Sequence, residues 1–201
     1  MANSFSTNFT LAREAVKHVK IKLTKGADNK LSDMYPSLGL VKVCVSRSRA
    51  AAEKSFNEHF NVAQGQLERE LAKNDEAFHG ELRAMNTRNL IGADIRIKAE
   101  KASSWKCGNC QEQAAVAFIY LLDHRVHPLD YYMFSDQSHA FVVIGRREDS
   151  DSTKPESWGS EAVICDPWCY LERNQVYAAK ELKRVWGSKS PHLHYSAPPL
   201  V

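Results

Sequence analysis

The sequence predicts an α+β fold: a central antiparallel sheet packed against one helix that begins at Cys110, with an N-terminal helical layer. Three observations predict it. Long stretches of the first half repeat their apolar residues at helical spacing, and residues 110–122 form an alanine-rich apolar segment. Residues 130–134, 140–144 and 162–165 are short apolar runs of the kind found in strands covered on both faces. A length of 201 residues with 43% hydrophobic side chains allows one domain with a helical extension.

The first hundred residues are predicted to be mainly helical. Residues 9–23 have one apolar face, residues 25–29 interrupt the pattern, and residues 46–73 and 78–91 are again helical. Residues 40–45 have strand propensity but could equally begin the next helix, and Ile95 and Ile97 alternate with charges as in a short strand. We therefore treat residues 1–100 as a helical layer or extension.

Residues 101–190 are predicted to form the core of the protein. The helix at residues 110–122 should bury one side, made of Ala114, Ala117, Phe118 and Leu121. The charged segment 146–159 is expected to be a surface loop, and residues 175–186 a short helix. The proline-containing end, residues 191–201, is expected to be a loose tail.

Composition excludes some functional classes. A net charge of +3 is too small to indicate a nucleic-acid partner, and no apolar run approaches the roughly 18 residues needed to span a membrane. The N-terminus lacks the basic start and apolar centre of a signal peptide. The odd number of cysteines, five, favours a reduced compartment without disulfides, with Cys44, Cys165 and Cys169 as small core residues.

Three residues form a candidate catalytic set. Cys110 follows a small turn at a helix start, where unpaired N–H groups and the helix dipole favour a thiolate. His139 begins one predicted strand and Asp166 ends the next, so an antiparallel pair would bring them to the same end of the sheet. A nucleophile, a base and a group that orients the base are the parts that acyl transfer needs.

Groups around this set have expected supporting roles. The backbone N–H of Cys110 would be one donor to an oxyanion, and the second could come from Asn109, from Gln111 or from an expected loop at residues 103–105. Glu112 is expected to be a favourable charge in the first turn of the helix. Trp168 is expected to pack over the histidine–aspartate pair.

The motifs Gly108-Asn109-Cys110, His139-Ala140-Phe141 and Cys165-Asp166-Pro167-Trp168 resemble those of papain-like and transglutaminase-like cysteine enzymes. The closest likeness is to YopT-like cysteine proteases and glutamine-deamidating toxins of bacterial pathogens. The resemblance covers about residues 105–170 and implies that Cys110 is the nucleophile, His139 the base and Asp166 the orienting group. Two departures are a long loop between the last two strands and the absence of a papain-type oxyanion glutamine.

This resemblance implies acyl transfer on a protein substrate without a cofactor or catalytic metal. The outcome could be proteolysis, deamidation or transglutamination, because all three use the same triad. It further implies a bacterial cytoplasmic protein that a specialised system could deliver into a host cell.

Other interpretations of the same residues remain open. Cys107 and Cys110 with Cys165 and Cys169 have the spacing of a structural zinc site, which would make the chain a zinc-stabilised binding module. Cys107 and Cys110 could instead be a redox pair. Cys110 could also be an inert buried residue of an adaptor that binds a partner through its helices.

Overall fold

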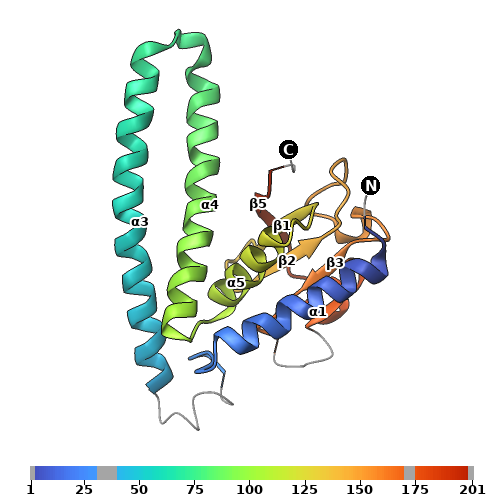
Figure 1. Cartoon of the computed structure of the whole chain (residues 1–201). Coiled ribbons are helices and arrows are strands. Elements are labelled where there is room, and N and C mark those ends of the chain that lie inside the picture. The colour runs from blue at the N-terminus through green and yellow to red at the C-terminus, as the bar shows by residue number, and fades with distance from the viewer. Residues whose placement is uncertain (1–2, 31–39, 170–174, 199–201) are drawn as a thin grey trace.

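The computed structural model of the chain describes residues 3–30, 40–169 and 175–198, and the fold is α+β (Figure 1). The helices are α1 (Phe5–Lys22), α3 (Leu40–Lys73), α4 (His79–Trp105), α5 (Cys110–Asp123) and α6 (Leu182–Trp186). The strands are β1 (Leu129–Phe134), β2 (Ala140–Ile144), β3 (Val163–Cys165), β4 (Val176–Ala178) and β5 (Pro191–Ser196). Short 3₁₀ turns are η1 (Glu76–Phe78), η2 (Pro155–Ser157) and η4 (Ala179–Glu181).

The sheet has five strands in the order β4-β3-β2-β1-β5, and every neighbouring pair is antiparallel. Its side chains alternate between two buried clusters, as the two-residue period of a strand requires. Tyr131 and Val142 belong to the cluster beneath the helices, whereas Tyr132 and Phe141 belong to the cluster on the opposite face. This confirms the prediction that the central strands are covered on both sides.

Helices α1 and α5 cover one face of the sheet. Both present small residues, and Ala12 and Ala15 of α1 are buried in the same cluster as Ala114 and Ala117 of α5. Small side chains let helix backbones approach the sheet closely. We call α1, α5, α6 and the sheet the body of the protein.

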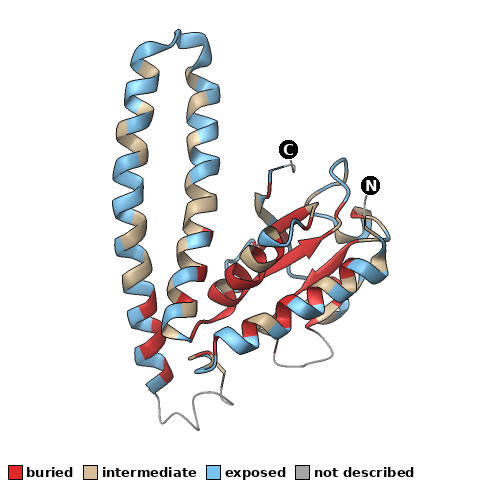
Figure 2. Ribbon diagram, in the orientation of Figure 1, coloured by how far each residue is buried: buried red, intermediate tan, exposed pale blue. Residues whose placement is uncertain are grey.

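Helices α3 and α4 form an antiparallel hairpin that projects from the body, and we call it the arm (Figure 1). Its buried residues are confined to the root: Ser48 is the last in α3 and Ile95 the first in α4. Figure 2 shows the contrast between this root and the rest of the arm, where the residues are exposed or of intermediate burial. Across the described ranges, no helix combines the length and apolar character needed to cross a membrane.

Several local predictions were wrong. Ile95 and Ile97 lie within α4 and not in a short strand, because the helical turns around them override their strand propensity. For residues 40–45 the helical alternative holds, since they begin α3. The predicted helix at 175–186 is instead β4, η4 and the short α6. Residues 191–196 are not a loose tail, since they form β5 and pair with β1 from Phe134↔Pro191 to Asp130↔Ser196.

Candidate functional site

The turn before Cys110 is held against the loop that follows α1. The Lys25 N–H donates to the Lys106 carbonyl at 2.8 Å, and the Gly108 N–H donates to the Gly26 carbonyl at 3.0 Å. Glycine is required at position 108, because a Cβ there would lie 2.4 Å from the Cβ of Glu112. The turn is therefore packed too tightly against α5 for any other residue.

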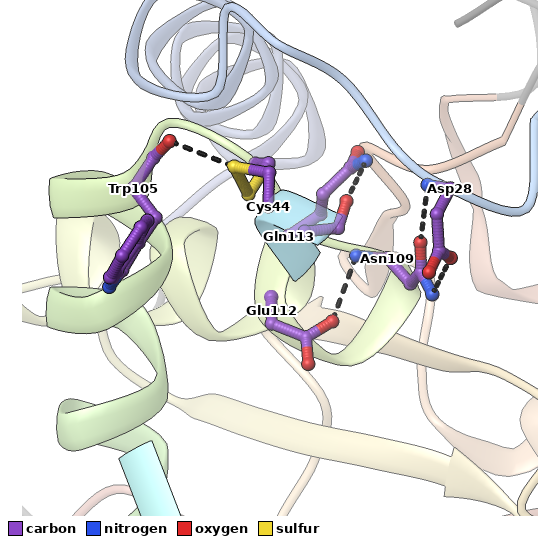
Figure 3. Close-up of a disulfide and its surroundings, with 8 residues drawn as sticks. Asp28, Cys44, Trp105, Asn109, Glu112 and Gln113 are labelled. Carbon is purple, nitrogen blue, oxygen red and sulfur yellow. Dashed lines mark hydrogen bonds between the residues drawn. A yellow bond between two sulfur atoms is a disulfide. The ribbon is translucent and has the colours of Figure 1, made fainter. Parts of the chain in front are cut away.

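Asn109 and Glu112 cap the start of α5. The Asn109 N–H donates to the Glu112 carboxylate at 2.8 Å, which is the returning half of a capping box. The Asn109 side chain accepts from the Asp28 N–H at 3.0 Å and donates to the Asp28 carboxylate at 2.6 Å (Figure 3). The first turn of α5, which contains Cys110, is thus held by Glu112 within the helix and by Asp28 in the loop after α1.

A disulfide joins Cys44, near the start of α3, to Cys107, just after α4, with an S–S distance of 2.07 Å (Figure 3). The prediction of no disulfide was therefore wrong. The partners are 63 residues apart in sequence and meet only because the arm returns to its own root. The bond also removes Cys107 from a redox pair with Cys110 and from the four-cysteine zinc set.

His139 and Asp166 form a buried pair at the end of the sheet. Their closest atoms, Nε2 and Oδ2, are 2.8 Å apart, and the side chains are 2% and 0% exposed. The second Asp166 oxygen, Oδ1, accepts the Cys169 N–H at 3.2 Å. Pairing of β2 with β3 at Val142↔Cys165 brings the two residues together, as the antiparallel arrangement predicted.

The Cys110 side chain contributes to the ionisation of His139. Burial disfavours the imidazolium, but the charge and hydrogen bond of Asp166, together with those of Cys110, raise the pKa of His139 to about 9. Cys110 is 9% exposed at the start of α5. Asp166 contacts the His139 imidazole directly, and Cys110 is close enough for its side chain to influence the ionisation of the same imidazole.

Aromatic rings enclose His139. Trp186 stacks on the imidazole with centroids 4.3 Å apart, and Trp168 lies at 5.2 Å. The Trp168 indole N–H donates to the Asn29 amide oxygen at 2.9 Å, which ties it to the loop after α1. The expected packing of Trp168 against the histidine is confirmed, and Trp186 is a second aromatic ring in contact with the same imidazole.

Of the expected sources of a second oxyanion donor, residues 103–105 are not a loop but the last residues of α4. Asn109 and Gln111 differ in their surroundings. The Asn109 N–H donates to Glu112 and its side-chain NH2 group donates to Asp28, so both groups are held by other partners. Gln111 uses its carbonyl to accept the Tyr131 hydroxyl at 3.0 Å, and its N–H belongs to the first helical turn, where the helix supplies no acceptor. Gln111 is therefore better suited than Asn109 to assist the Cys110 N–H.

Sequence reasoning missed Arg49, which donates to the Glu112 carboxylate through Nε at 2.7 Å and Nη2 at 3.2 Å. It also missed the contact of Asp28 with the cap and the stacking of Trp186. The Asn-x-x-Glu spacing of a capping box was available from residues 109 and 112, but no local pattern marks the other contacts.

Within the described ranges, no three histidine, cysteine, aspartate or glutamate side chains lie together in a way that could hold a metal ion. Comparisons of the chain with protein-family models, with curated proteins and with solved structures find no match.

Proposed function

We propose that the protein is a cysteine-dependent acyl-transfer enzyme with Cys110 as nucleophile, His139 as general base and acid, and Asp166 as the group that orients the histidine. The observation that carries the proposal is the buried 2.8 Å contact between His139 and Asp166, together with a Cys110 side chain close enough to influence the ionisation of the same imidazole. This arrangement supports the papain-like or transglutaminase-like core that the motifs suggest.

The residues can carry out both halves of the reaction. The Cys110 sulfur attacks a carbonyl carbon, the C–N bond breaks, and His139 gives its proton to the departing nitrogen. Water then attacks the thioester, His139 accepts a proton from that water, and the Cys110 sulfur is released. Asp166 keeps the imidazole oriented and its charged form favourable throughout.

The proposed substrate is a protein, on which the carbonyl belongs either to a peptide bond or to a glutamine side chain. Intact-mass measurement of a test protein separates these outcomes: deamidation adds about 1 Da, whereas proteolysis yields two fragments. Delivery of the enzyme into a host cell, as the resemblance suggests, is a further part of the proposal.

Replacement of Cys110 tests the proposal. We expect Cys110→Ala to abolish covalent capture by a thiol-directed peptide inhibitor and to abolish the mass change of the substrate. Cys165→Ala is the matched control, because burial raises the pKa of the Cys165 thiol far above its usual value and keeps it unreactive. Unchanged capture and turnover in Cys110→Ala would refute the proposal.

A further inference from the structure

The root of the arm touches the start of α5 at two places. The disulfide joins α3 to Cys107, three residues before Cys110, and Arg49 of α3 pairs with Glu112, two residues after it. Glu112 is only 5% exposed, whereas Arg49 is half exposed at 50%. A single α3 side chain therefore neutralises a nearly buried carboxylate in the turn that carries the proposed nucleophile.

We infer that Arg49 is a positioning residue that keeps Cys110 reactive, by holding the capping carboxylate of Glu112 and compensating its negative charge. This inference rests on the proposed function, because it concerns the thiolate that would attack the substrate. The contacts are continuous: Arg49 binds Glu112, and Glu112 accepts the N–H of Asn109, the residue directly before Cys110.

The charges near Cys110 show why Arg49 matters. His139 and its partner Asp166 lie at the strand ends, and Asp28 lies in the loop after α1. Glu112 is in α5 itself, and α4 and β1 contribute Asp94 and Tyr131. Tyr131 interacts with Cys110, with Glu112 and with Asp94. His139 and Arg49 both respond to the charge of Cys110, and Arg49 pairs directly with Glu112. Lys98 of α4 lines the same hollow but pairs with Asp94.

The electrostatic coupling agrees with the geometry. The hydrogen bond to Glu112 raises the pKa of Arg49 against a smaller effect of burial, and the charges of Glu112, Asp28 and Cys110 raise it further. Arg49, Gln111 and Glu112 also line one surface hollow of about 390 Å³ between α3, α4 and α5. Solvent and small reagents can therefore reach the first turn of α5 from the side where Arg49 contacts Glu112.

Alkylation of Cys110 by iodoacetamide, a neutral reagent, tests the inference without a substrate. The rate is measured from pH 5 to 10 without reductant, and peptide mass spectrometry confirms that Cys110 is the labelled residue. In Arg49→Gln we expect the midpoint of the pH–rate profile to move up and the rate at pH 7 to fall about three- to tenfold, because an opposite charge is lost but is half exposed.

Charge variants distinguish electrostatics from a merely structural role. Arg49→Lys keeps the charge and should stay near wild type. Glu112→Gln removes the carboxylate but keeps an acceptor for the Asn109 N–H, so its midpoint should move down. The Arg49→Gln/Glu112→Gln double variant should return toward wild type, since neither charge remains.

Arg47→Gln is the matched control, because Arg47 is an exposed arginine on α3 two residues away. Profiles of Arg49→Gln and Glu112→Gln that superimpose on wild type and on this control would overturn the inference. If Arg49→Gln fails to fold by circular dichroism, Glu112→Gln and Arg49→Lys decide the question alone. A chain whose Cys110 responds as expected but never turns over a protein substrate would refute the proposed function and leave this inference intact.

Discussion

The body and the arm of this protein are stabilised in different ways. In the body, the sheet is enclosed by two buried clusters, and β2 is buried along its whole length. In the arm, residues 49–94 include no buried side chain. The body is therefore stabilised mainly by its buried core, whereas the arm is stabilised by helix propensity and by the contact between its two helices.

The candidate site lies where these two regions meet. His139 directly precedes β2 and Asp166 directly follows β3, while Cys110 begins a helix whose start is joined to α3 by the Arg49–Glu112 pair and by the disulfide at Cys107. The root of the arm therefore contacts the turn that carries the proposed nucleophile, whereas its far end is separate from the site. Five expected results test this division, in order of decreasing effect.

Phe141→Ala should cause the largest loss of stability. The ring is fully buried in the body, between Tyr132 and Phe134. Removal of a buried aromatic side chain costs about 3–5 kcal/mol, from lost burial and the cavity that remains. Urea denaturation measures this change, and a loss below about 1 kcal/mol would mean that the body is less tightly packed than described.

The Cys44→Ala/Cys107→Ala double variant should lose about 2–4 kcal/mol, because the disulfide restricts the unfolded chain over a long loop. In a chain of this size the melting temperature should fall by on the order of 10 °C. Wild type should show the same fall when reductant is added, and the double variant should not respond to it. A melting temperature that reductant leaves unchanged in wild type would show that the bond contributes nothing.

His139 should titrate abnormally, with a pKa of about 9 in the wild-type protein. NMR titration of its ring should give a lower pKa in Cys110→Ala and a still lower one in Asp166→Asn, since Asp166 has the larger effect. His139→Asn identifies the resonance by its loss. The reverse order of the two variants, or no change in either, would contradict the described coupling.

The same pKa has a consequence for stability. The pKa of His139 is higher in the folded chain, at about 9, than its ordinary value of 6.5. The contacts of the imidazolium therefore stabilise the fold fully below about pH 6.5, and this contribution is lost as the pH rises through 9. The stability difference between wild type and His139→Asn should shrink over that interval.

Phe60→Ala should have the smallest effect, below about 1 kcal/mol, because the ring is 38% exposed in the arm. The substitution removes the same side chain as Phe141→Ala and so provides a direct comparison of the two regions. Urea denaturation under identical conditions measures both. A loss as large as that of Phe141→Ala would show that the arm has a packed interior after all.

Local pattern was enough to predict the central elements of the body. The apolar run at 140–144 matches β2, and the alanine-rich segment matches α5 with its four predicted buried residues. Antiparallel pairing of neighbouring strands then sufficed to bring His139 near Asp166. These features depend on short-range periodicity, which a single sequence contains.

Contacts between distant segments could not be predicted in this way. Cys44 and Arg49 reach the turn around Cys110 only because α4 returns along α3, and nothing near either residue indicates its partner. The edge strand β5 was missed because its residues are only partly buried and gain a strand conformation by pairing with β1. The family resemblance and the enzymatic activity remain predictions for the experiments above.

The disulfide also closes the arm into a covalent ring with the turn at η1 on its far side. A protease that cut the backbone at η1 would leave Cys44 on one fragment and Cys107 on the other. The two fragments would stay joined and would migrate as one species on a gel until a reductant separated them. The chain can thus survive a break at its most protruding point as a single molecule.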